Sequence, residues 1–178
     1  KYYLTQTPIN EYKTLRDEEN KVELNDVTIN ETNNPLNNFS GDSYEIVANL
    51  KPDSTCSEVG FKVRTGYDQE TVIKYNLENK QLTIDRLKSG VIVVEGERLN
   101  VCSQNVELNA DGSIDLHIYV DRSSVEVFTN DYIVAGAMQI FASPVCKGLS
   151  IYSIDGNATG DITIYPMKTI WTDKLTPT

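Results

Sequence analysis

The fold is decided by one stretch of sequence, IDLHIYVDRSSVEVF, at residues 114–128. In its first half every even-numbered residue is aliphatic and every odd-numbered residue is polar or amphipathic, which predicts a strand with one buried face. After the polar residues in the middle, the aliphatic positions become odd-numbered. A hairpin that pairs Val120 with Val125 and Ile118 with Val127 explains this change, because it brings both aliphatic sets to one face.

The predicted hairpin has a buried side and a polar side. The residues expected in the core are Leu116, Ile118, Val120, Val125 and Val127. The opposite, polar face should place His117, Tyr119 and Asp121 beside Phe128, Glu126 and Ser124.

The same alternation recurs along the chain and predicts further strands. They are expected at residues 44–50, 59–64, 71–76, 81–85, 133–141, 149–153 and 161–165. Many short strands separated by turn-forming residues favour an all-β fold, and we expect a two-sheet antiparallel β-sandwich of the concanavalin or jelly-roll kind. We expect residues 1–178 to form a single module. Residues 10–20 could be helical, although an extended lead-in is an equal alternative.

Composition excludes several functions. The chain has 178 residues, enough for one domain, and a net charge of −10 from 16 basic and 26 acidic residues. An acidic balance argues against nucleic acid and anionic membranes as partners, because both require basic residues. A single histidine and cysteines without ligand spacing argue against a metal site, and nothing points to a cofactor.

Three cysteines and three glycosylation sequons bear on the compartment. Cys102 and Cys146 could form a disulfide in a secreted protein, whereas the alternative is that all three cysteines are buried free thiols. Sequons at Asn30, Asn38 and Asn157 agree with an extracellular location. Because the first residue is Lys1, we expect a fragment or a processed product.

The hairpin motif also carries a resemblance to a known family. DRSSVEVF at residues 121–128, followed by Asn130 and Asp131, resembles the signature of the C-terminal domain of glycoside hydrolase family 32. That family contains invertases, levanases, inulinases and fructan exohydrolases. Segments that match in the same order are 6–16, 60–66, 82–90 and 168–171. The resemblance implies the accessory sandwich of a larger, retaining β-fructosidase.

The resemblance also implies what this chain does not contain. The catalytic propeller domain of the family is marked by an Asn-Asp-Pro-Asn-Gly motif, an Arg-Asp-Pro motif and a Glu-Cys motif, and none of them occurs here. We therefore expect no catalytic residue in this chain, and we expect its partner to be the catalytic propeller domain of the parent enzyme. Fructan or fructose is the second expected partner.

Two uses of the polar face remain open at this point. It could dock on the catalytic domain, or it could bind fructose units of levan or inulin through Tyr119 and Glu126, with His117 and Asp121 beside them. Arg64 and Tyr75, on neighbouring predicted strands, would extend such a site.

A glycosidase pair made of Asp121 and Glu126 is the less favoured interpretation. Instead, we expect Asp121 to accept hydrogen bonds in the turn and Glu126 to pair with an Arg or Tyr.

The turn after the hairpin departs from the family. Members often have Gly after Asn-Asp, a residue that suits positive φ, whereas this chain has Tyr132. We expect the hairpin to survive, because Asn130 and Asp131 tolerate that geometry, and we expect Tyr132 to project from the tip of the loop.

Overall fold

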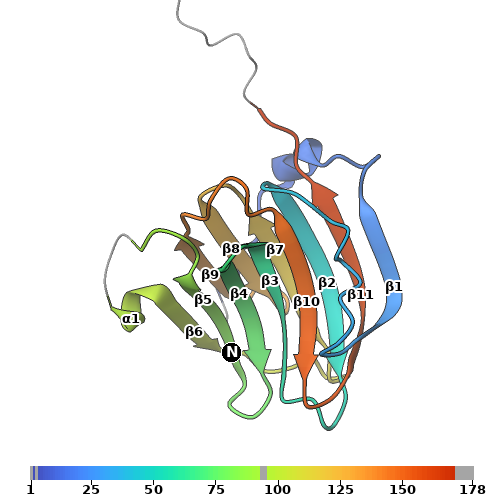
Figure 1. The fold of residues 1–178 in the computed structure, drawn as a ribbon. Coiled ribbons are helices and arrows are strands. Elements are labelled where there is room, and N and C mark those ends of the chain that lie inside the picture. The colour runs from blue at the N-terminus through green and yellow to red at the C-terminus, as the bar shows by residue number, and fades with distance from the viewer. Residues whose placement is uncertain (1, 3, 93–95, 171–178) are drawn as a thin grey trace, which may run out of the picture.

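The computed structural model describes residues 2, 4–92 and 96–170 and shows a nearly all-β protein (Figure 1). In chain order, the elements are the 3₁₀ helix η1 (Asn10–Leu15), β1 (Val22–Ile29), β2 (Tyr44–Pro52), β3 (Glu58–Gly66), β4 (Gln69–Asn76), β5 (Gln81–Lys88), α1 (Glu97–Asn100), β6 (Val101–Asn105), β7 (Ile114–Val120), β8 (Ser124–Thr129), β9 (Val134–Gln139), β10 (Gly148–Ile154) and β11 (Ala158–Pro166). None of the helices in this described part has the length and apolar character needed to cross a membrane.

The strands form two antiparallel sheets, as the alternation predicts. The first sheet has six strands in the order β1-β11-β2-β7-β8-β9, and the second has five in the order β10-β3-β4-β5-β6. The inward side chains of both sheets make one hydrophobic core between them. The two-sheet antiparallel β-sandwich is therefore confirmed.

The central hairpin has the predicted register. Val120 pairs with Val125 and Ile118 pairs with Val127, on β7 and β8. All five aliphatic residues predicted for the core of this hairpin are buried, with at most 2% of their surface exposed. The phase change across the turn is thus sufficient to define both the hairpin and its buried side.

Two strands escaped the sequence pattern, for physical reasons. In β1 the register shifts between Leu24 and Val27, and Asp26 has a φ of 50°, so a β-bulge interrupts the alternation. β6 lies at the edge of its sheet and is only half-buried, so its sequence, VCSQN, has no clear apolar face.

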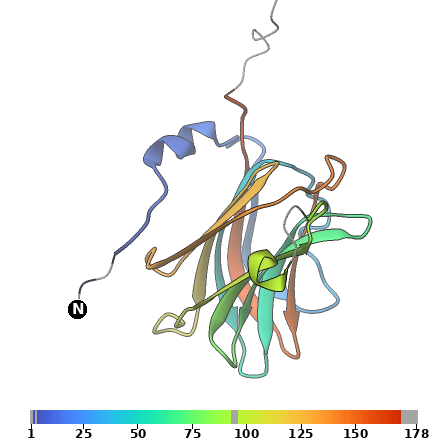
Figure 2. The same ribbon diagram turned by 90° about the vertical axis from the view of Figure 1, so that its left-hand side faces the viewer.

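The N-terminal region combines both of the alternatives left open for it. Residues 10–15 form η1, whereas Arg16 is already extended and makes a bridge to Met167. None of the residues of η1 is buried. Figure 2 shows this segment outside the sandwich, next to one of the sheets rather than within the core.

The cysteines are free thiols in the structure, so the Cys102–Cys146 disulfide is not formed. Cys56 and Cys146 are buried, but Cys102 on β6 is partly exposed. The alternative of three buried thiols therefore holds for two of them.

Candidate functional site

The polar face of the hairpin lies on the outer side of the six-stranded sheet. As predicted, Tyr119 lies opposite Glu126 and His117 lies opposite Phe128. The rings form a cluster: those of His117 and Tyr119 are tilted, with centroids 4.9 Å apart, and those of Tyr119 and Phe128 meet edge-to-face at 6.3 Å.

Tyr132 does not project from the loop, contrary to the expectation. Asn130, Asp131 and Tyr132 all have positive φ, so the turn keeps the predicted geometry without glycine. However, the turn folds Tyr132 back over the sheet, where its hydroxyl lies 3.2 Å from Nδ1 of His117. Its ring centroid is 6.3 Å from that of Phe128, so Tyr132 is part of the aromatic cluster.

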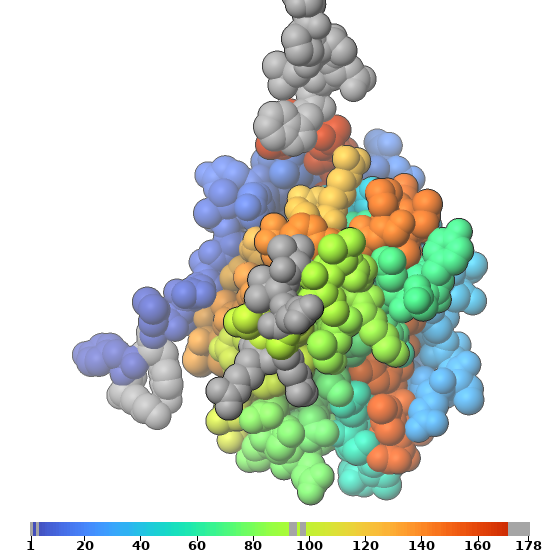
Figure 3. Space-filling view, turned by 60° about the vertical axis from the view of Figure 1, so that its left-hand side comes forward, coloured from blue at the N-terminus to red at the C-terminus, as the bar shows by residue number. Residues whose placement is uncertain are grey.

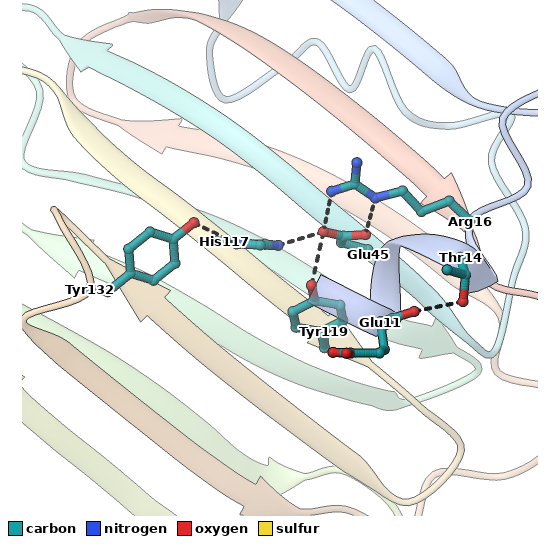
Figure 4. A network of polar contacts seen from close by, with 7 residues as sticks. All are labelled: Glu11, Thr14, Arg16, Glu45, His117, Tyr119 and Tyr132. Atoms are coloured by element: carbon teal, nitrogen blue, oxygen red, sulfur yellow. Dashed lines mark hydrogen bonds and ion pairs between the residues drawn. The ribbon is translucent and has the colours of Figure 1, made fainter. Parts of the chain in front are cut away.

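A buried carboxylate, Glu45 on β2, lies at the centre of this face (Figure 4). The guanidinium of Arg16 donates two hydrogen bonds of 2.7 Å to its two oxygens. The Oε1 atom also lies 2.5 Å from Nε2 of His117 and accepts a bond of 3.1 Å from the Tyr119 hydroxyl. A fully buried charge is tolerated because it is paired and hydrogen-bonded on both oxygens.

The pKa values of this network follow from its geometry. Burial alone would raise the pKa of Glu45, but the hydrogen bonds and charges of Arg16 and His117 lower it to about 2. Burial and the neighbouring Glu45 carboxylate raise the pKa of Tyr119. The hydrogen bond to Glu45 raises the pKa of Arg16. The pair is therefore ionised at neutral pH.

The N-terminal segment, residues 4–16, lies along the outer side of this sheet, and we call it the strap. The amide of Gln6 donates to the carbonyl of Tyr132 (3.0 Å), and the ring of Tyr12 packs edge-on against Tyr119 (5.4 Å). Arg16 stacks its guanidinium over Tyr165, 4.1 Å from the ring centre. Figure 3 shows the blue strap along one flank of the molecule, next to the orange β9 region.

Two grooves flank the aromatic cluster. The first, about 510 Å³, lies between the strap and the β7–β8 turn and is lined by Tyr12, Tyr119 and Glu126 among others; we call it the turn groove. The second, about 340 Å³, is lined by His117 and Tyr132 among others. The predicted patch is therefore divided between two open grooves.

Asp121 and Glu126 both line the turn groove. The Asp121 carboxylate accepts a hydrogen bond from the amide of Arg122 (2.8 Å), as expected for a turn residue. No hydrogen bond or ion pair within the described part of the chain reaches the Glu126 carboxylate, so the expected Arg or Tyr partner is not found there. Glu45 takes that role instead.

Arg64 does not belong to this face. It lies on β3 in the other sheet and is 1% exposed, because a β-bulge with a φ of 52° turns its side chain inward. Its guanidinium donates to five backbone carbonyls, those of Asp42, Asp121, Arg122, Ser143 and Cys146. Arg64 therefore stabilises the β7–β8 turn through its hydrogen bonds from inside the sandwich, and it cannot extend a surface site.

Tyr75 is likewise excluded from the polar face. It lies on β4 of the five-stranded sheet, is fully buried, and donates its hydroxyl to the carbonyl of Val106 (2.9 Å). Both errors share one cause, because the sequence predicted the strands but not the sheet to which each belongs; at Arg64 the β-bulge is a second cause.

Sequence reasoning also missed Glu45 and its partner Arg16. Glu45 faces Tyr119 only because β2 pairs with β7, two strands far apart in the chain. A charged residue in the apolar first half of β2 was the available signal. The order of strands that gives this signal its meaning could not be predicted from local alternation.

The outer side of the five-stranded sheet is chemically different. It carries paired charges, Lys62 with Glu70 and Lys74 with Glu58, each at 3.0 Å. A groove of about 490 Å³ lies between them and Tyr152. Tyr152 donates its hydroxyl to Glu58 (2.8 Å), so this groove is lined mainly by groups that satisfy one another.

Fold and surface together define a class: an all-β sandwich whose distinctive chemistry lies on an open sheet face. The sequence profile described as "Glycosyl hydrolases family 32 C terminal" matches residues 11–166. The chain belongs to this family.

Related proteins agree with the assignment. The chain is 51% identical over 173 residues to a fructan beta-fructosidase of Streptococcus mutans serotype c, covering 97% of this chain and 12% of that protein. It is 37% identical over 172 residues to a levanase of Bacillus subtilis strain 168, covering 94% and 25%. The chain thus spans a quarter or less of the length of these relatives.

Solved structures show the same fold. An exo-inulinase from Aspergillus awamori superposes with a TM-score of 0.83 at 22% identity, over 96% of this chain and 34% of that one. A sucrose-6-phosphate hydrolase from Lactobacillus gasseri superposes with a TM-score of 0.73 at 26% identity, over 95% and 32%.

Proposed function

We propose that this chain is the non-catalytic accessory module of a sucrose- or fructan-hydrolysing glycoside hydrolase, and that it docks on the catalytic domain through the outer face of its six-stranded sheet. Its relatives are several times longer, which leaves room in them for such a domain. The proposal includes the extracellular location expected from the sequence.

One observation carries the docking proposal: five large apolar side chains on this face keep more than a third of their surface exposed. They come from the strap, from β2 and from the β8–β9 turn, and they are Leu4, Ile9, Tyr12, Val47 and Ile133. Together with the aromatic cluster, they supply the apolar and aromatic groups that are typical of the centre of a protein interface.

A grafting experiment tests the docking proposal. This chain replaces the segment that it matches in the Streptococcus mutans relative, and the melting temperature and fructose release of the chimera are measured. Val47→Glu should lower the melting temperature of the catalytic part, because it places a charge within the contact. Ile154→Glu is the matched control, since Ile154 is 36% exposed and Val47 is 38% exposed. Equal effects of the two substitutions on the melting temperature would reject the outer face of the six-stranded sheet as the docking surface.

A second function, fructan binding, is supported by the turn groove. Its Glu126 carboxylate has no partner within the described residues, and Tyr12 and Tyr119 line the same groove. A free acceptor beside aromatic rings suits sugar hydroxyls and the apolar faces of sugar rings. Retardation of the chain in gels that contain levan or inulin tests this alternative.

A further inference from the structure

The strap is attached to the sheet by few contacts. None of the residues of η1 is buried, so apolar burial contributes little to holding it. Two of its side chains reach the sheet through polar or ring contacts: Tyr12, packed on Tyr119, and Arg16, paired with Glu45. Backbone bonds hold the two ends, from Gln6 to Tyr132 and from Lys168 to Leu15.

The Arg16–Glu45 pair is the strongest of these contacts. It has two parallel hydrogen bonds of 2.7 Å, and its carboxylate is fully buried beneath the strap. A two-point contact fixes direction as well as distance, so it sets how the strap crosses the sheet.

We propose that the Arg16–Glu45 pair is a latch that holds the strap in the shape in which Leu4 and Ile9 contact the catalytic domain. Arg16 and Glu45 are then positioning residues for docking. This inference rests on the proposed docking function. The strap carries three of the five exposed apolar residues of the docking surface, Leu4, Ile9 and Tyr12, so a loose strap would weaken that surface without damaging the sheet.

The sandwich should stay folded without the latch, although it should be less stable. Arg16 lies on the solvent side of the sheet, and its backbone bridge to Met167 does not involve the side chain. Without Arg16, the Glu45 carboxylate keeps the contacts to His117 and Tyr119. Breaking the latch should therefore release the strap and leave the core folded.

Acid should open the same latch. The titratable groups facing Glu45 are Arg16 from the strap and His117 and Tyr119 from β7; Tyr165 of β11 faces Arg16, and Tyr132 faces His117. Of these, Glu45 is the group whose protonation removes a charge from the pair. The strap of the wild-type chain should loosen as the pH falls below 4.5, whereas that of Glu45→Gln should be loose at every pH.

The first stage of the test uses this chain. Amide exchange at Gln6 and tryptic cleavage after Lys13 are compared for Arg16→Met, Glu45→Gln and the double variant. Both rates should rise about tenfold or more in each variant, with no further rise in the double one, because the singles break the same pair. Lys21→Met is the matched control, since Lys21 pairs with Glu23 at 2.8 Å on the exposed surface.

The second stage uses the chimera. Arg16→Met should lower the melting temperature of the catalytic part, as Val47→Glu does, whereas Lys21→Met should not. Unchanged exchange at Gln6 in Arg16→Met would overturn the latch. A released strap with an unchanged chimera would overturn its role in docking but not docking itself. An unchanged chimera in Val47→Glu as well would reject the proposed function.

Discussion

The two outer faces of the sandwich are built from strands with the same alternating pattern, but they carry their charged groups differently. On the five-stranded sheet, Lys62 and Lys74 keep about a third of their side-chain surface in water and pair with neighbouring glutamates. On the six-stranded sheet, the acidic group Glu45 is completely buried and held by a guanidinium, an imidazole and a phenol.

The difference teaches how such faces are used. Exposed Lys–Glu pairs contribute little stability and keep a surface hydrated. A buried, fully bonded carboxylate beside aromatic rings makes a rigid surface that loses little side-chain entropy when a protein covers it. This contrast is why we assign docking to the six-stranded face.

The largest effect should come from a charge beneath the docking face. Val125→Asp places an unpaired carboxylate in the core, which costs several kcal/mol and approaches the roughly 5–15 kcal/mol stability of a domain. The variant should be largely unfolded by circular dichroism. Val72→Asp, at a partly exposed outward position of β4, should cost about 1 kcal/mol or less. Similar losses of stability in Val125→Asp and Val72→Asp would contradict the assignment of Val125 to the core.

Removal of the buried carboxylate should have the next largest effect. Glu45→Gln leaves Arg16 without a counter-charge and should lower the unfolding free energy by about 3 kcal/mol. Lys62→Met, which breaks the more exposed of the two pairs on the other face, should cost about 1 kcal/mol or less. Urea denaturation measures both. A loss of less than 1 kcal/mol for Glu45→Gln would show that the buried network contributes no more to stability than the exposed pairs of the other face.

Acidification should separate the faces in the same way. The pKa of Glu45 is about 2 in the folded chain, below its ordinary value of 4.5, so its stabilisation is complete above pH 4.5 and is lost as the pH falls towards 2. The amount lost is about 3 kcal/mol. Wild type and Glu45→Gln should converge in stability over this interval. A constant difference in unfolding free energy between wild type and Glu45→Gln over this pH interval would contradict the pairing of Glu45 with Arg16.

How much of this the sequence could predict depends on chain distance. The β7–β8 hairpin joins strands that are adjacent in the sequence, so one change of phase between Val120 and Val125 revealed both register and burial. The bulge at Arg64 breaks alternation within a strand, so its inward direction could not be predicted. The Glu45 network needs β2 beside β7 and the strap above both, and local patterns contain neither fact.

A smaller effect is expected for sugar. If the turn groove binds fructan, affinity should be weak, with a dissociation constant on the order of 0.1–1 mM, because an open groove buries little of a ligand. Glu126→Ala should reduce retardation in levan or inulin gels. Glu70→Ala, on the charged face, is the control. Loss of retardation in Glu70→Ala alone would indicate that the chain binds fructan on the five-stranded sheet and not in the turn groove.

No turnover is expected from either face. The chain should release no fructose from sucrose, levan or inulin, because Asp121 is engaged in its turn and the catalytic motifs of the family are absent from the sequence. Sugar release measured on the purified chain checks this. Turnover that Asp121→Asn or Glu126→Gln abolishes would contradict the accessory role.

The central claim is tested most directly by comparing amide hydrogen exchange in the free chain and in the chimera. If the six-stranded face docks, exchange should slow in residues 4–16 and 130–133 when the catalytic domain is present, and the β3–β4 turn at 66–69 should be unchanged. Slower exchange confined to the β3–β4 turn, or no change in either region, would contradict docking through this face.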